Sequence, residues 1–231
     1  MYKRALLKLS GETLSSGDSS ISPNALRIVS DEIKRALETN HVELAIVLGA
    51  GNIWRGAQKD MDRVAADKIG MLATVMNSIA LKDELIRNNL KAEVFCPSKV
   101  SALVKEYDNE KVIKYLKKGY ITILAGGTGN PFFTTDSGAA LRAAEIKADI
   151  VMKATQTDAI YSDDPKKNPK AVKFDKLSFN EALEKHLRIM DETAFALCLD
   201  ANINILVFDF YKKGNLEKVL SGEKIGTIVV K

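Results

Sequence analysis

Short apolar runs alternate with helical patterns along almost the whole chain, and this alternation constrains the fold more than any other feature. The apolar runs have the length of buried strands, and the segments between them repeat apolar residues at helical spacing. Strands that alternate with helices are typical of a mainly parallel sheet covered by helices on both faces. The sequence therefore predicts an α/β protein, a three-layer α/β/α sandwich. The predicted strands are Ala5–Leu9, Leu44–Leu48, Ala92–Cys96, Ile121–Ala125, Ile150–Ala154, Asn204–Phe208 and Thr227–Val230, and the predicted helices are Pro23–Glu38, Met61–Arg87, Asp136–Lys147, Phe179–His186 and Asp191–Leu199.

The bulk composition is that of one globular domain with a substantial core. The 231 residues are 46% hydrophobic and 28% charged, and 34 basic against 30 acidic residues give a net charge of +4. This mildly basic balance suits an anionic metabolite, and the chain lacks the dense basic block of a nucleic-acid-binding face. We therefore expect no nucleic-acid partner.

The compartment and the membrane are addressed by the cysteines and by the apolar runs. Cys96 and Cys198 lie in apolar patterns without CxxC spacing, so we expect buried thiols in a reducing compartment, the cytoplasm. The N-terminus leads directly into a strand pattern without a cleavage signal. No apolar run approaches the roughly 20 residues of a membrane span, so we expect no membrane partner.

A loop rich in glycine and threonine, Gly126–Asp136, joins a predicted strand to a predicted helix. Glycines allow the backbone to approach a ligand closely. A helix N-terminus offers unpaired N–H groups and the positive end of its dipole to a phosphate. An ordinary turn capped by Thr135 or Asp136 has a similar composition, so the loop alone does not decide between a binding site and a turn.

Other predicted strands end in the same kind of residue. Lys8–Gly11 follows the first strand, Gly49–Asn52 with Arg55 follows the second, and Lys153–Thr155 closes a later one. In open α/β sheets, ligands bind beyond the carboxyl ends of the strands, so these segments predict one shared site. The chain contains no GxxxxGK[ST] sequence and no complete GxGxxG sequence, so neither a P-loop nor a Rossmann dinucleotide site is supported.

The side chains at these strand ends suit phosphoryl transfer. That reaction asks the protein mainly for positioning and for neutralisation of charge on the migrating group. Lys8 and Arg55 supply positive charge, and loop carboxylates are available to orient a lysine or to hold Mg²⁺ or a ribose. Helix capping is the alternative role for Asp136 and Asp191, which lie at predicted helix starts. The loop carboxylates are Asp136, Asp158, Asp164 and Asp191.

Taken together, these motifs resemble the bacterial uridylate kinases, which belong to the amino-acid kinase superfamily. The resemblance covers essentially the whole chain, and the motif that begins at Thr128 is its most specific part. It implies the amino-acid kinase fold and ATP-dependent phosphorylation of UMP to UDP, a step of pyrimidine nucleotide biosynthesis. The matching segments are Lys8–Glu12, Gly49–Asn52 with Arg55–Gly56, Arg63–Asp67, Gly70–Asn77, Gly127–Asp136, Lys153–Thr155, Asp158, Tyr161 and Asp164–Pro165.

The resemblance also implies a role for each site residue. Lys8 would stabilise the transferring phosphoryl group, Arg55 would lie where the two nucleotides' phosphates meet, and Asp136 and Asp191 would support the lysine and the Mg²⁺ environment. An acceptor-binding part is expected at about 1–150 and an ATP-binding part at about 151–231 of a single domain. The implied ATP-binding residues are Lys8, Leu9, Ser10, Gly11, Gly51, Arg55, Thr155, Tyr161 and Asp164. The implied UMP-binding residues are Ala50, Asp67, Thr128, Gly129, Asn130, Pro131, Phe132, Phe133, Thr134 and Thr135.

The resemblance further implies a homohexamer that depends on Mg²⁺, is inhibited by UTP and is often activated by GTP. Two departures stand out. Ala50 replaces a glycine that is usual in the second loop, so its methyl group needs a tolerant backbone or narrows the UMP pocket. Members that respond to GTP carry basic residues and a histidine where this chain has Lys82, Ile86 and Glu93. We therefore expect little or no activation by GTP.

Two other functions stay open on the sequence alone. An amino-acid kinase that acts on a carboxylate or carbamate would share Lys8 and the ATP residues, whereas Asp67 and the Gly129–Asp136 run favour a nucleotide acceptor. A non-catalytic nucleotide-binding module would have the same fold. The presence of Lys8 and Asp191 argues against it.

Overall fold

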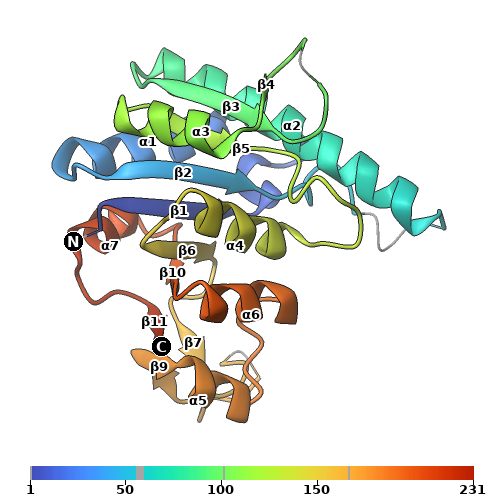
Figure 1. The fold of residues 1–231 in the computed structure, drawn as a ribbon. Coiled ribbons are helices and arrows are strands. Elements are labelled where there is room, and N and C mark those ends of the chain that lie inside the picture. The colour runs from blue at the N-terminus through green and yellow to red at the C-terminus, as the bar shows by residue number, and fades with distance from the viewer. Residues whose placement is uncertain (1, 56–59, 101, 166) are drawn as a thin grey trace.

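The computed structural model describes residues 2–55, 60–100, 102–165 and 167–231 (Figure 1). Its centre is a nine-stranded sheet in the order β4-β3-β5-β2-β1-β6-β10-β11-β9, and β7 and β8 form a separate pair. The strands of the large sheet are β1 (Arg4–Leu9), β2 (Glu43–Leu48), β3 (Ala92–Cys96), β4 (Lys105–Glu106), β5 (Ile121–Leu124), β6 (Ile150–Thr155), β9 (Lys176–Ser178), β10 (Asn204–Asp209) and β11 (Thr227–Val230). The small pair consists of β7 (Ile160–Tyr161) and β8 (Lys173–Phe174).

Neighbouring strands of the large sheet run parallel except for β10 and β11, which pair antiparallel. The predicted mainly parallel sheet is therefore confirmed. The register places Lys8 beside Lys153 on the neighbouring strand, and Thr155 beside Asp209 on the next. Residues that lie far apart in the sequence thus meet at the carboxyl edge of the sheet.

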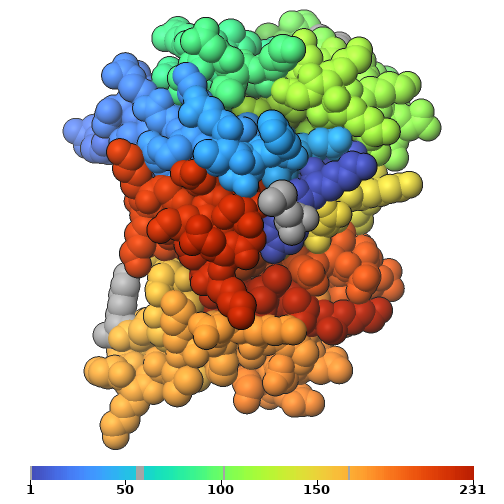
Figure 2. All heavy atoms as spheres, turned by 90° about the vertical axis from the view of Figure 1, so that its left-hand side faces the viewer, coloured from blue at the N-terminus to red at the C-terminus, as the bar shows by residue number. Residues whose placement is uncertain are grey.

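Helices cover both faces of the sheet, as the predicted three-layer sandwich requires (Figure 1). One face packs against α1 (Pro23–Thr39), α2 (Arg63–Arg87) and α7 (Asn215–Ser221). The other packs against α3 (Asn109–Lys117), α4 (Thr135–Glu145), α5 (Phe179–Glu184) and α6 (Glu192–Asp200). Figure 2 shows the red C-terminal segment beside the blue N-terminal part of the chain, where the Glu32 carboxylate accepts from the Gly214 N–H at 2.7 Å.

Every predicted strand and helix is present, with ends that shift by one or two residues. Helix α2 begins at Arg63 rather than Met61, because the Asp62 carboxylate caps it by accepting from the Ala65 N–H at 3.0 Å. Helices α3 and α7 and the short strands β4, β7, β8 and β9 were not predicted. Helix α7 follows a left-handed Gly214 and has no side-chain cap, so its start carries no capping signal.

Helix α2 corrects two expectations. The helical spacing of its apolar residues predicts one buried face, yet Val75 is buried whereas Leu72, Met76, Ile79 and Ile86 are 39–53% exposed. No membrane-length segment was expected, yet α2 is long and apolar enough to cross a membrane by length and composition alone. Helices that pack one side on a sheet pass the same test, so this finding is weak support for a span. The exposed fractions of Leu72, Met76, Ile79 and Ile86 show an apolar face that the described part of the chain leaves uncovered.

Candidate active site at the carboxyl edge of the sheet

The turns after β1 and β2 touch backbone to backbone, and this contact requires a glycine. A Cβ added at Gly11 would lie 2.7 Å from the Gly49 carbonyl oxygen and 2.9 Å from the Gly51 nitrogen. Real Cβ atoms do not approach so closely, so a larger residue would push the turns apart. Buried Asn77 holds the second turn, since its amide donates to the Gly49 carbonyl at 2.8 Å and bonds with Asn52.

A carboxylate between two lysines lies at the centre of this edge. Asp136, in the first turn of α4, contacts Lys8 Nζ at 2.8 Å and Lys153 Nζ at 2.7 Å. Lys153 also donates to the Ile189 carbonyl at 2.7 Å. Burial by itself would raise the pKa of Asp136, but the two lysines outweigh burial and hold the pKa below its usual value. Positive charge is thus fixed where the strands end.

Lys153 was expected at the shared site through its segment, but it was not assigned a catalytic or binding role, although the sequence contained a signal for one. Like Lys8, it interrupts an apolar strand one or two residues before the strand ends. An isolated buried charge is costly, so each lysine called for an acidic partner. The structure gives both lysines the same partner.

Asp191 is bonded to the loop Gly126–Asp136, the threonine loop. Its carboxylate accepts from the Ala194 N–H at 3.0 Å, which caps α6, and from Ser137 Oγ at 2.8 Å. It also accepts from the Thr134 hydroxyl. Asp191 thereby ties the start of α6 to the start of α4, and it caps α6 as the alternative role predicted. Ser137 was not predicted as a site residue.

A first cavity, of about 280 Å³, lies between α2 and the threonine loop. Asp67 is on its wall, and the Asp67 carboxylate accepts from the Phe132 N–H at 2.7 Å and from Arg63 Nε at 2.8 Å. Desolvation alone would raise the pKa of Asp67, but these two donors hold it below its usual value. Of the predicted UMP residues, the cavity is lined by Ala50, Asp67, Thr128, Asn130, Phe133, Thr134 and Thr135.

The remaining predicted UMP residues lie elsewhere on the loop. Gly129 and Pro131 line a neighbouring cavity of about 300 Å³. Phe132 is 64% exposed and has a left-handed backbone with φ of 73°. Bulky residues rarely adopt this conformation, so the bond from its N–H to Asp67 helps to hold a strained turn.

Ala50 needs no special backbone. It is not among the described non-glycine residues with positive φ, so an alanine is tolerated where a glycine was usual. Its carbonyl accepts from the N–H groups of Ile53 and Trp54 at 2.9 and 2.8 Å. Its side chain lines the first cavity. The methyl group therefore affects the cavity surface rather than the conformation of the turn.

Arg55 is bonded to the turn that follows β1. Its guanidinium forms an ion pair with Glu12, and its Nε donates to the Gly51 carbonyl at 3.3 Å. Glu12 belongs to the short helix η1 (Gly11–Leu14), which Ser10 caps. Glu12 was not predicted as a site residue, and Gly56 of the motif lies outside the described residues.

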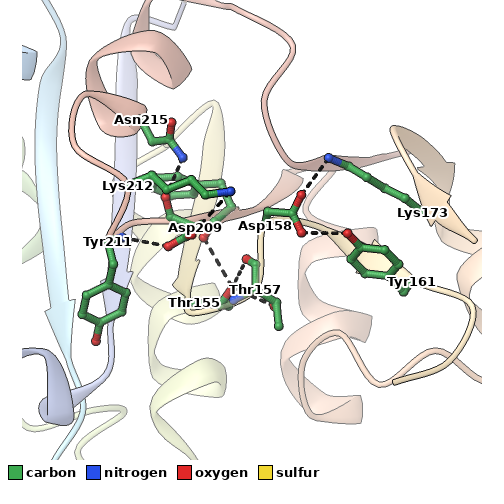
Figure 3. Close-up of polar contacts among 10 residues, drawn as sticks. Thr155, Thr157, Asp158, Tyr161, Lys173, Asp209, Tyr211, Lys212 and Asn215 are labelled. Atoms are coloured by element: carbon green, nitrogen blue, oxygen red, sulfur yellow. Dashed lines mark hydrogen bonds and ion pairs between the residues drawn. The ribbon is translucent and has the colours of Figure 1, made fainter. Parts of the chain in front are cut away.

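A second cavity, of about 610 Å³, lies beside the end of β6. Thr155, Tyr161 and Asp164 line it together with Lys153, so three predicted ATP residues line the same cavity. Tyr161 donates to the Asp158 carboxylate at 2.8 Å, and Lys173 Nζ lies 3.0 Å from that carboxylate (Figure 3). The bond to Asp158 raises the pKa of Tyr161.

Leu9 differs from the other predicted ATP residues. Its side chain is completely buried in the core, and its carbonyl accepts from the Gly49 N–H at 2.9 Å. The side chain is therefore not available to a nucleotide.

Cys96 and Cys198 are free, buried thiols, as predicted.

Comparisons with known proteins address the family of the chain. Residues 3–209 match the amino acid kinase family. A uridylate kinase from Alcanivorax borkumensis is 47% identical over 232 residues, covering 99% of this chain and 92% of that protein. Among solved structures, UMP kinase from Bacillus anthracis has a TM-score of 0.94 at 35% identity, over 99% of this chain and 96% of that one. UMP kinase from Ureaplasma parvum has a TM-score of 0.94 at 38% identity, over 100% of both chains.

The fold and the matched residues place the chain in the amino acid kinase family. Within that family it belongs with the uridylate kinases, because the sequence match extends over nearly the full length of both proteins. A more distant uridylate kinase, from Archaeoglobus fulgidus, has a TM-score of 0.73 at 26% identity, over 98% of this chain and 99% of that one.

Proposed function

We propose that the chain transfers the terminal phosphoryl group of ATP to UMP and so forms ADP and UDP. The observation that carries this proposal is the Asp136 carboxylate, which holds Lys8 and Lys153 between the two cavities. Lys153 lines the larger cavity, and Thr135, next to Asp136, lines the smaller one. The names of the full-length relatives support UMP as the acceptor.

The larger cavity is assigned to ATP. The phosphates of ATP extend from this cavity toward Lys8. The backbone N–H groups after β1 lie in the turn that Gly11 keeps tight against the second loop. Lys8 and Lys153 supply positive charge for the phosphoryl group as it moves between two oxygens. Because their charges are already positioned by Asp136, no reorganisation is needed at the moment of transfer.

The smaller cavity is assigned to UMP. The N-terminus of α4, with Thr134 as its cap, presents N–H groups and hydroxyls toward a phosphate. Asp67 and the threonine loop surround the nucleoside. Arg55, paired with Glu12, lies at the turn where the two phosphate groups are expected to meet. These assignments correspond to an acceptor part at about 1–150 and an ATP part at about 151–231.

A divalent metal ion accompanies ATP use in this kinase family, and we propose Mg²⁺. Within the described residues, no group of three or more His, Cys, Asp or Glu side chains could hold a metal. Asp136 is occupied by two lysines. Mg²⁺ commonly binds phosphate oxygens and retains several waters, so it needs few protein ligands. The side chains present at the site therefore fit an Mg²⁺ ion that arrives bound to ATP. Such an ion would neutralise charge on the phosphates.

The direct test is ADP release with a panel of acceptors: UMP, CMP, dUMP, glutamate and carbamate. We expect UMP to be the best substrate, and EDTA to abolish turnover until Mg²⁺ is restored. Faster turnover with glutamate or carbamate would identify a different amino-acid kinase. ADP release that no acceptor stimulates would identify a binding module.

The exposed face of α2 is the surface proposed for self-association into a homohexamer. Leu72 and Met76 are each 53% exposed there, and uncovered apolar patches commonly mark protein interfaces. Sedimentation velocity should show that Leu72→Glu lowers the assembly state. Leu183→Glu is the matched control, since Leu183 on α5 is equally exposed. A Leu72→Glu protein that assembles like the wild type would contradict this interface.

UTP is proposed as an inhibitor that occupies the UMP cavity through Asp67 and the Thr128–Thr135 loop. Competition kinetics of UTP against UMP provide the test. Inhibition that excess UMP cannot reverse would place the UTP site elsewhere.

The cytoplasm is proposed as the compartment, in keeping with two buried thiols that form no disulfide.

A further inference from the structure

Asp209 ends β10 as the strand partner of Thr155, which lines the ATP cavity, and the functions assigned above do not use Asp209. Its Oδ1 accepts from the Tyr211 N–H at 2.9 Å. Its Oδ2 has the Lys212 ammonium at 3.9 Å, too far for a hydrogen bond, and Lys212 is 65% exposed. The Asp209 side chain itself is only 12% exposed. A mostly buried carboxylate thus keeps one oxygen with acceptor capacity.

The strand register places the Asp209 side chain on the face of the sheet that borders the ATP cavity. Asp209 is the partner of Thr155 on the adjacent strand. Side chains alternate along a strand, so Asp209 shares a face with Val207, which lines the ATP cavity, whereas Phe208 enters the opposite core. Figure 3 shows the Thr155–Thr157 turn between Asp209 on one side and Asp158 with Tyr161 on the other.

We propose that Asp209 accepts a hydrogen bond from a ribose hydroxyl of the ATP donor; this inference rests on the proposed function. Strand β6 separates β10 from β1, and Lys8 is level with Val207, two residues before Asp209. At about 4.8 Å per strand and about 3.3 Å per residue, Asp209 is about 12 Å from Lys8 between Cα atoms. That distance is comparable with the length of a triphosphate chain from its last phosphorus to its sugar. With phosphates at Lys8, the sugar reaches Asp209.

The chemistry of Asp209 favours a neutral donor. A phosphate oxygen would be repelled by the carboxylate. A metal would need further ligands, and the described residues contain no cluster of three or more candidate side chains. The hydroxyl groups of a ribose can donate to a carboxylate at a strand end, as in other nucleotide-binding sheets. This contact involves no charge repulsion and needs no further ligands.

A substrate–variant cycle tests this contact. The values of kcat/KM for ATP, 2′-deoxy-ATP and 3′-deoxy-ATP are compared in the wild type and in Asp209→Ala. We expect the variant to lose roughly ten-fold or more with ATP, the size of one hydrogen bond to a charged group. It should lose little with the analogue that lacks the bonded hydroxyl. Asp200→Ala, at an exposed carboxylate that ends α6, is the matched control.

The outcomes separate this contact from a structural role and from the proposed function. Equal losses with ATP and with both deoxy analogues would overturn the contact, because lost folding or a lost metal ion affects all three alike. Unchanged kinetics in Asp209→Ala would also overturn it. If Thr155→Val raises the KM for ATP while Asp209→Ala does not, the ATP cavity stands and the ribose contact fails. If neither variant affects ATP, the assigned ATP cavity itself is wrong.

Discussion

The side of the site that we propose for the acceptor is built largely from backbone, whereas the side that we propose for the donor is built largely from side chains. In the threonine loop, Gly126, Gly127, Gly129 and Phe132 all have left-handed backbones, and α4 begins directly after them. The donor side places polar side chains on the ends of parallel strands and on the β7–β8 pair. Backbone sites need particular residues at particular spacings. Side-chain sites need only chemical types that the sheet brings together.

The two sides share one set of charges, and the account depends on that connection. Asp136 belongs to α4 on the acceptor side, and Lys153 belongs to β6 on the donor side. Lys8 joins both from β1 between them. Changes at this junction should therefore affect turnover most, and changes farther out should affect one nucleotide alone.

The largest expected effect is that of Lys8→Ala. Loss of a charge that acts mainly on the transition state should lower kcat by roughly a thousand-fold and change either KM much less. Steady-state kinetics of the folded variant measure this, with Lys111→Ala on α3 as the surface control. Turnover close to that of the wild type would remove Lys8 from the catalytic site.

Asp136→Asn should lower turnover by about a hundred-fold, since the two lysines lose their shared partner. It should also change how stability depends on pH. The folded pKa of Asp136 is lowered, so its stabilisation is complete above the carboxyl's unfolded pKa and is lost as pH falls through the folded value.

Thermal melts of the wild type and of Asp136→Asn between about pH 7 and about pH 3 test this linkage. The wild type should have the higher Tm at neutral pH, and the difference should shrink in acid. A difference that stays constant through the acid range would mean that the ionised carboxylate does not stabilise the fold.

The smallest expected effect is activation by GTP. Lys82, the cationic residue among the compared effector positions, lies 2.5 Å from the Glu93 carboxylate, which Lys105 also approaches at 3.3 Å. Its charge is therefore already paired. An exposed charge contact contributes roughly 1 kcal/mol or less, so GTP should activate at most a few-fold. The test measures initial rates against GTP concentration at subsaturating UMP. Strong sigmoidal activation would refute this prediction.

The difference between the two sides also explains how far the sequence alone could lead. The glycine loops and the alternation of strands and helices leave periodic or spaced signals, so the sheet, its main helices and the threonine loop were predictable. The exposure of Leu72 on α2 was not, because an exposed apolar face has the same sequence pattern as a face that packs in the core. Ser137 and Asp209 became site candidates only through contacts and register that no local pattern encodes. For Lys153 the sequence predicted a place at the site, and only the structure revealed that it shares Asp136 with Lys8.

We propose that UMP and ATP occupy separate cavities and that their phosphates meet at Lys8. A crossed measurement of KM in Asp67→Ala and Thr155→Val tests it most directly, since each residue lines one cavity. The account predicts that Asp67→Ala raises the KM for UMP roughly ten-fold and leaves that for ATP nearly unchanged, with the reverse in Thr155→Val. Comparable losses for both nucleotides in either variant would contradict two separate cavities.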